Sequence, residues 1–186
     1  MIGFAMCGSY CTHKEALEQL RGLKEKGKEL QPIVSENVYV TNTRFGSCET
    51  LREQLQDLCQ RPVIHTIAQA EPLGPKAPLE MLVICPCTGN TLAKLATGIT
   101  DTSVTMAAKA HLRRDRPLVI ALASNDALSA NLRNLGTLLS RKGVYFVPLR
   151  QDDPQGKPHS LVADFSLLER TMEEAREGKQ LRKLFL

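Results

Sequence analysis

Thiol, hydroxyl and amide side chains gather in one short stretch of the chain, "CPCTGNT" at positions 85–91. Its two cysteines have the spacing C-x-C, and no Cys or His pair at zinc-finger spacing lies nearby, so we predict no metal site. Cys7 and Cys85 end apolar runs, and free cysteine is among the most buried residue types, so we expect both thiols to be buried. With a metal site disfavoured, the small polar side chains of this stretch are better suited to binding a ligand.

Small polar residues also follow other apolar runs, as Gly8-Ser9, Ser35 and Ser124-Asn125. The Gly-Ser turn has two interpretations: its free N–H groups bind a phosphate, or it makes the turn and caps the next helix. The phosphate-loop motif lacks its lysine, because Ser9 stands there, and the pattern G-x-G-x-x-G is absent. ATP and NAD are therefore poorly supported as ligands.

The four histidines do not form a recognisable pair of nucleophile and base, so the sequence assigns no catalytic residue. His13 and His111 fall within helical patterns, where we expect them to be solvated. We expect His65 to lie in the core, within a strand, and His159 to lie in a polar loop.

Short, nearly continuous apolar runs alternate with amphipathic helical patterns along the whole chain. The runs predict parallel strands that are buried on both faces: 2–7, 31–35, 62–67, 81–85, 117–123 and 144–149. The helical patterns cover 12–26, 47–59, 91–96, 103–114, 129–142 and 165–177. Pro-rich stretches at 70–78 and 151–159 are predicted surface loops. We predict one α/β domain over 1–186, a three-layer, doubly wound parallel sheet of about six strands with a Rossmann-like fold.

The composition of the chain disfavours several classes of protein. The 186 residues carry a net charge of +4 without a concentrated basic face, and only 4% are aromatic, which disfavours nucleic-acid binding. No apolar run reaches the ~20 residues of a membrane span, so we expect no membrane partner. The first residues lack the pattern of a secretory signal, so we expect a cytoplasmic protein with reduced thiols.

Several segments together resemble the flavoprotein family of homo-oligomeric flavin-containing decarboxylases. The strand-four signature of that family matches Pro86–Thr91, followed by Lys94–Asp101, in order and with the same spacing. Its Gly-Ser first turn matches Gly8-Ser9, and its serine after the second strand matches Ser35. The match extends over most of the chain up to Leu149.

The resemblance implies FMN as the cofactor and a homo-oligomer, either a trimer or a dodecamer. Arg44 and Lys94 are expected by position to bind carboxylates of the substrate. The residues expected to hold the cofactor are Gly8, Ser9, Ser35, Pro86, Cys87, Thr88, Asn90, Thr91, Ser124 and Asn125.

Segments such as "FGSCETLREQL" and "RQDDPQGKPHSLVAD" are most similar to one branch of the family. That likeness implies oxidation of a dihydropyridine dicarboxylate to an aromatic diacid, together with a Rossmann-type partner that brings NADP. The hard chemistry in such a reaction belongs to the cofactors, and the protein positions the ring.

The chain also departs from the decarboxylases of the family. Their active-site histidine has no counterpart between Ser35 and Arg61, and the Pro and Met of their "Pro-Ala-Met-Asn" segment are Leu122 and Ser124 here. Two alternatives therefore stay open. One is a non-catalytic protein that holds substrate in a vestigial flavin pocket, and the other is a flavin-dependent decarboxylase of another acid.

Overall fold

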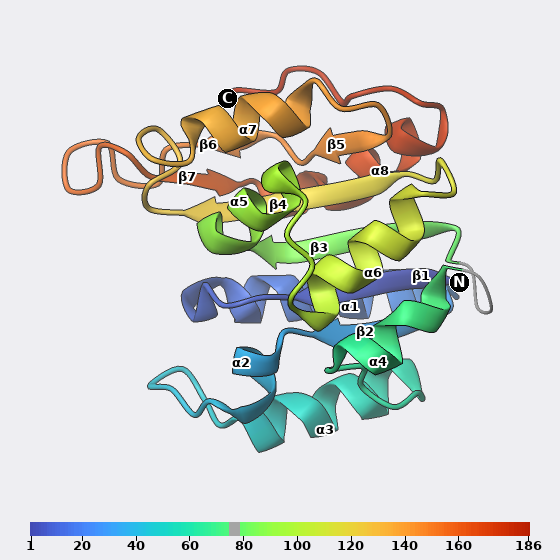
Figure 1. Cartoon of the computed structure of the whole chain (residues 1–186). Helices are drawn as coiled ribbons and strands as arrows, with labels where there is room; N and C mark the ends of the chain where they lie inside the picture. The colour runs from blue at the N-terminus through green and yellow to red at the C-terminus, as the bar shows by residue number, and fades with distance from the viewer. Residues whose placement is uncertain (75–78) are drawn as a thin grey trace.

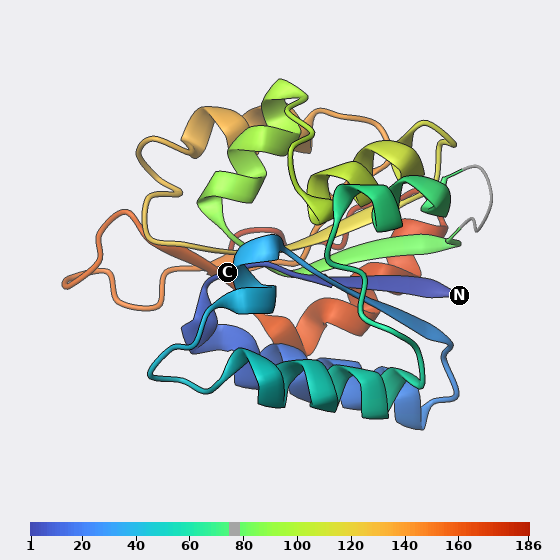
Figure 2. The same ribbon diagram turned by 60° about the horizontal axis from the view of Figure 1, so that its bottom comes forward.

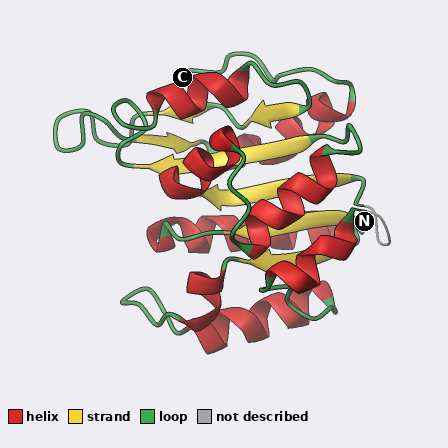
Figure 3. Cartoon of the chain, viewed as in Figure 1, coloured by secondary structure: helices red, strands yellow, loops and turns green. Residues whose placement is uncertain are grey.

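Seven strands form one sheet in a computed structural model that describes residues 1–74 and 79–186 (Figures 1 and 3). The strand order is β2-β1-β3-β4-β7-β6, and β5 also pairs with β4. The strands are β1 (Ile2–Met6), β2 (Leu30–Val34), β3 (Met81–Cys87), β4 (Leu118–Ser124), β5 (Val144–Phe146), β6 (Leu149–Arg150) and β7 (Leu161–Ala163).

Helices cover both faces of this sheet, which confirms the predicted doubly wound α/β fold. In Figure 2, α1, α3 and α8 lie on one face, and α4, α5, α6 and α7 lie on the other. The helices are α1 (His13–Glu25), α2 (Glu36–Val40), α3 (Cys48–Cys59), α4 (Ile67–Ala70), α5 (Gly89–Thr97), α6 (Ser103–Leu112), α7 (Leu132–Leu139) and α8 (Leu168–Arg176). Short 3₁₀ turns lie at Tyr10–Thr12, Glu71–Leu73 and Phe165–Leu167.

The central strands are parallel and enclosed on both sides, as their continuous apolar sequences require. Every residue of β1, β2, β3 and β4 is buried. β1 pairs with β2 on one side and with β3 on the other, so the strand order reverses between β1 and β3. Ligands of open α/β sheets bind outside the carboxyl ends of the strands at such a point.

The prediction of a strand over 62–67 was wrong. The segment forms a single parallel bridge, Ile33 to Ile64, and then turns into α4. Thr66 accepts a hydrogen bond from the N–H of Gln69, and the Gln69 side chain accepts from the N–H of Thr66. This reciprocal capping box starts a helix where the apolar run alone indicates a strand.

The run at 144–149 is not one strand, because it divides near Pro148 into β5 and β6. Proline has no N–H to donate to a sheet, so it sits where pairing is interrupted. β6 instead pairs antiparallel with β7, and β7 pairs antiparallel with β4. The predicted loop at 151–159 is the connection between β6 and β7, while residues 75–78 of the other predicted loop lie outside the described residues.

Candidate functional site

A cavity of about 740 Å³ opens at the carboxyl ends of β1, β3 and β4, and we call it the strand-end cavity. Its volume falls within the usual range of small-molecule sites. Its wall consists of Ser9, Cys11, Thr12, Glu15, Thr88, Gly89, Asn90, Ala123, Ser124, Asn125, Asp126, Arg150, Asp152, Lys157, Ser160 and Val162. Five of the predicted cofactor-binding residues therefore meet at one cavity: Ser9, Thr88, Asn90, Ser124 and Asn125.

The turn after β1 brings Ser9 to this cavity. Ser9 has left-handed backbone angles, φ 58° and ψ 47°, and its hydroxyl donates to the carbonyl of Ala123 at 2.7 Å. Within the described residues, the N–H groups of Ser9 and Tyr10 have no hydrogen-bond acceptor. Successive N–H groups in such a turn form a concavity that suits an anion.

Gly8 is not in the cavity wall but allows the close approach of the next segment. A Cβ added to Gly8 would lie 3.2 Å from Cγ2 of Thr88, a tight contact. Thr88 is the N-cap of α5, and its hydroxyl oxygen accepts from the N–H of Thr91 at 3.2 Å. Thr91 is buried, and its hydroxyl contacts Sγ of Cys7 at 3.2 Å, so it holds β1 against α5 instead of facing the cavity.

Asp126 is the centre of a hydrogen-bond network at the end of β4. Its carboxylate accepts from the hydroxyl of Ser124, and from Nδ2 of Asn131 at 2.9 Å to each oxygen. These donors lower the pKa of Asp126, the Ser124 hydroxyl most of all. Gly89 packs against the same network: a Cβ there would lie 2.4 Å from Oγ of Ser124. Asp126 is therefore a fixed, ionised carboxylate at the cavity wall.

The opposite wall is the hairpin of β6 and β7, whose residues the sequence analysis did not assign to the site. It contributes Arg150, Asp152 and Lys157, with Nζ of Lys157 placed 2.9 Å from a carboxylate oxygen of Asp152. This pairing lowers the pKa of Asp152 and raises the pKa of Lys157. Leu128 donates to the carbonyl of His159 at 2.9 Å, which ties the hairpin loop to the segment after β4.

Other predicted site residues lie elsewhere in the described structure. Ser35 is the N-cap of α2, where its hydroxyl oxygen accepts from the N–H of Val38 at 3.4 Å. Pro86 and Cys87 are buried within β3. Lys94 lies 2.9 Å from a carboxylate oxygen of Asp101 and lines a different cavity.

Arg44, the other predicted substrate-binding residue, is exposed, and its guanidinium lies 4.8 Å from the ring centre of Phe45. It is not among the described residues of the strand-end cavity. The loop after α2 carries it away from the ends of β3 and β4, so the structure does not bring it to the predicted cofactor-binding residues.

Two histidines differ from their predicted solvated positions, because both are buried. Nε2 of His13 lies 2.8 Å from the carbonyl oxygen of Cys7 and 3.2 Å from that of Gly8. Nε2 of His111 lies 2.8 Å from the carbonyl oxygen of Pro117. Burial lowers the pKa of both imidazoles, so both are neutral near pH 7.

His65 also departs from expectation, because it is only partly buried and stacks on Tyr39 with ring centres 3.6 Å apart. Cys7 and Cys85 are fully buried, as predicted. Within the described residues, no group of three or more Asp, Glu, His or Cys side chains is placed to hold a metal ion. Among the helices of residues 1–74 and 79–186, none combines the length and the apolar character of a membrane span.

Comparisons with known proteins place this architecture in a family. The model of the family described as Flavoprotein matches residues 1–167. The B subunit of dipicolinate synthase from Bacillus subtilis (strain 168) is 45% identical over 185 residues, which cover 100% of this chain and 92% of that protein.

Solved structures agree with this assignment. The crystal structure of the dipicolinate synthase B subunit from Bacillus halodurans C superposes with a TM-score of 0.91 and 40% identity, covering 100% of this chain and 95% of that one. The FMN-dependent cysteine decarboxylase SpaF has the same fold, with a TM-score of 0.69 and 21% identity over 94% of this chain and 95% of its own. The chain therefore belongs to the flavoprotein family, and along its whole length it is homologous to the B subunit of dipicolinate synthase.

Proposed function

We propose that this chain is the B subunit of a dipicolinate synthase. It acts with the A subunit to convert dihydrodipicolinate, or its hydrated precursor, to dipicolinic acid, in the mother-cell cytoplasm of a sporulating bacterium. The observation that carries the proposal is 45% identity to the dipicolinate synthase B subunit along the entire chain. The strand-end cavity at the switch point of the sheet supports a ligand-binding role for the chain.

The strand-end cavity fits FMN in its donor set. The N–H group of Ser9 and the guanidinium of Arg150 suit a phosphate. The hydroxyl and amide groups of Thr88 and Asn90 and the ionised carboxylate of Asp126 suit the hydroxyls of a ribityl chain. FMN, when bound, would supply a two-electron acceptor for the oxidation. The protein's part is to orient the ring and to exclude water.

The proposed reaction removes a hydride and a proton from the dihydropyridine ring and leaves both carboxylates in place. NADP would reach the assembly through the A subunit, and the B subunit would form a homo-oligomer, a trimer or a dodecamer. Aromatisation makes the oxidation favourable, so the assembly needs an electron acceptor and a site that holds the dianion.

The test is to purify this chain together with the A subunit of the synthase and to measure dipicolinate formation with and without FMN and NADP. Full activity only with both proteins and added FMN is the expected result. Full activity from the isolated A subunit would overturn a catalytic role and favour a non-catalytic binding protein. Release of CO2 by this chain alone would instead indicate a flavin-dependent decarboxylase.

A matched pair of variants tests whether the strand-end cavity holds FMN. Asn90 lines the cavity, whereas Asn37 is an exposed asparagine outside it. Asn90→Ala should weaken FMN binding, measured by flavin fluorescence, roughly tenfold, the effect of one hydrogen bond. Asn37→Ala should leave the affinity unchanged. Equal affinities in the two variants would argue against FMN in this cavity.

A further inference from the structure

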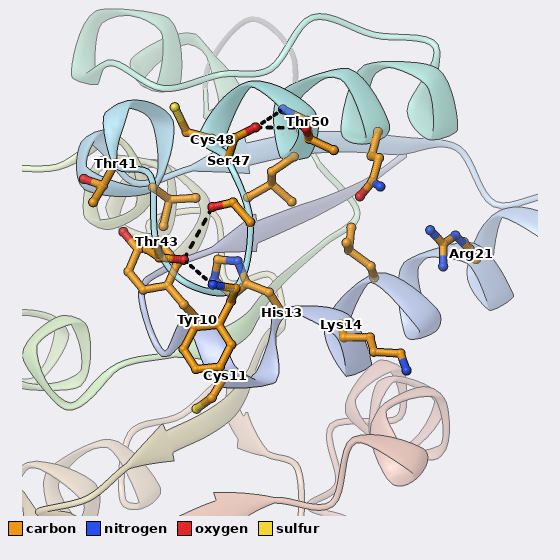
Figure 4. Close-up of a pocket in the computed structure, with 16 residues that line it drawn as sticks. Tyr10, Cys11, His13, Lys14, Arg21, Thr41, Thr43, Ser47, Cys48 and Thr50 are labelled. Atoms are coloured by element: carbon orange, nitrogen blue, oxygen red, sulfur yellow. Dashed lines mark hydrogen bonds between the residues drawn. The ribbon is translucent and has the colours of Figure 1, made fainter.

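A second cavity, of about 530 Å³, lies between α1, α2 and α3, and we call it the helix cavity (Figure 4). Figure 4 shows Lys14 and Arg21 on α1, and both line this cavity together with residues of the loop before α3. Cys11 lines both the helix cavity and the strand-end cavity, so the two are neighbours. None of the residues predicted from the sequence to bind cofactor or substrate lines this cavity.

The charge of the helix cavity is positive. Lys14 and Arg21 line it, and no Asp or Glu is among the described residues of its wall. Within the described residues, neither cation forms an ion pair with a carboxylate. Two cations without a protein counter-ion beside a cavity attract an anionic ligand.

The strand-end cavity has the opposite balance. Its wall carries the carboxylates of Glu15, Asp126 and Asp152 against the cations Arg150 and Lys157. Because Lys157 pairs with Asp152, two carboxylates and one guanidinium remain. A ligand with two separate carboxylates is therefore better accommodated in the helix cavity, which offers two cations, whereas Arg150 and the N–H of Ser9 can hold a single phosphate in the strand-end cavity.

The spacing of the two cations suits a ligand with two separate anionic groups. Lys14 and Arg21 are seven residues apart on α1, about 10 Å along the helix axis at 1.5 Å per residue. Both side chains are long and exposed, so they can converge on the two carboxylates of one ring.

The remaining wall suits the ring that carries the carboxylates. The rings of Tyr10 and Phe45 and the side chains of Leu17 and Leu51 give apolar surface. Polar side chains of Thr43 and Ser47 also line the wall, where the Thr43 hydroxyl donates to the carbonyl of Gly46 at 3.5 Å and the Ser47 hydroxyl shares a hydrogen bond with that of Thr50 at 2.9 Å (Figure 4). Apolar walls with a few polar groups are typical of small-molecule sites.

His13 adds one acceptor to this wall. Both oxygens that contact its Nε2 belong to carbonyl groups, which only accept, so we assign the proton to Nε2. Nδ1 is then unprotonated and can accept a hydrogen bond from water. The imidazole adds no charge to the cavity.

We propose that the helix cavity binds a ring dicarboxylate, with Lys14 and Arg21 each holding one carboxylate. The proposal rests on the proposed function for the identity of the ligand, and it gives the dicarboxylate a site beside the strand-end cavity instead of inside it. It replaces Arg44 and Lys94 as the carboxylate-binding residues.

Isothermal titration calorimetry of the full chain with pyridine-2,6-dicarboxylate tests the site. Lys14→Ala and Arg21→Ala should each raise the Kd about tenfold or more, the effect of losing one charge-assisted hydrogen bond. Lys24→Ala is the matched control, because Lys24 is an exposed cation of the same helix outside the cavity. The control should leave the Kd unchanged.

A ligand with a single carboxylate, pyridine-2-carboxylate, separates the two contacts. It should bind more weakly, and its Kd should respond to only one of the two substitutions. The proposal would be overturned if Lys24→Ala raised the Kd as much as Arg21→Ala does. It would also be overturned if neither Lys14→Ala nor Arg21→Ala weakened dicarboxylate binding.

FMN titration of the same variants keeps this outcome separate from that of the proposed function. Arg21→Ala should bind FMN as the unmodified chain does, because Arg21 does not line the strand-end cavity. If FMN fails to bind while the dicarboxylate binds with the expected dependence on Arg21, the cofactor assignment fails and the helix cavity stands. If FMN binds and the dicarboxylate binds independently of Lys14 and Arg21, the reverse holds.

Discussion

Replacement of Gly89 by alanine tests how tightly the network around Asp126 is packed. An added Cβ would lie 2.4 Å from Oγ of Ser124, and 2.7 Å from both Nδ2 of Asn131 and Oδ1 of Asp126. Two of these three atoms donate hydrogen bonds to Asp126, so a shift that relieves the contact weakens bonds to a charged group. Overpacking costs about 1–3 kcal/mol, and each such bond contributes about 1.5–3 kcal/mol.

The gain from replacing glycine in a helix is at most about 1 kcal/mol, and Gly89 is the first residue of α5. We therefore expect Gly89→Ala to lower the free energy of unfolding by about 2 kcal/mol. At about 2–4 °C per kcal/mol for a chain of this size, the Tm should fall by about 4–8 °C.

Gly22→Ala is the matched control, because a Cβ there meets nothing within 4 Å in the middle of α1. It should raise the free energy of unfolding by about 0.5–1 kcal/mol. Urea denaturation followed by circular dichroism measures both variants. A Gly89→Ala protein as stable as Gly22→Ala would refute the packing at the end of β4.

Three further predictions concern protonation, thiol reactivity and capping. The free energy of unfolding should fall as the pH drops below 6.5, by up to about 1.4 kcal/mol per pH unit per histidine. The reason is that His13 and His111 resist protonation in the folded protein, whereas the unfolded chain takes up the protons. Urea titrations from pH 7.5 to 5 measure this slope, and His111→Gln should make it smaller. Maleimide at pH 8 should modify exposed Cys11 long before Cys7, since burial raises the pKa of Cys7 to about 11, and mass spectrometry would reveal the opposite order. Ser47→Ala should cost about 1 kcal/mol in urea denaturation, because the Ser47 hydroxyl oxygen accepts from the backbone N–H three residues on at the start of α3; an unchanged midpoint would contradict this.

The central sheet could be predicted from the sequence because burial on both faces leaves continuous apolar runs. β1, β3 and β4 lie within two residues of their predicted bounds. The failures occur where local hydrogen bonding competes with hydrophobicity. Thr66 and Gln69 cap a helix inside an apolar run, and the three residues of β7 are too short for any pattern to indicate a strand.

The same distinction applies to the site. Ser9, Thr88 and Ser124 lie at the ends of three neighbouring strands, and parallel strands bring their carboxyl ends to one edge, so the meeting of these residues could be predicted. The direction of each side chain could not be predicted from the sequence. The hydroxyl of Ser35 caps its own helix, and Lys94 pairs with Asp101. The residues proposed to bind carboxylates, Lys14 and Arg21, have no signal in the sequence beyond a spacing of seven, which shows only that two cations share one face of a helix.

The two walls of the strand-end cavity are built from different parts of the fold, so substitutions in them have different effects on stability. The wall from β1, β3 and β4 is tied to the core, so a substitution such as one at Gly89 disturbs the fold itself. The opposite wall is a single antiparallel hairpin outside the parallel frame, which joins β4 through β7 and the C-terminal segment through a bridge from Leu149 to Phe185. The exposed loop between β6 and β7 brings Asp152 and Lys157 to the cavity, so substitutions in this loop change the charge of the wall without touching the parallel frame.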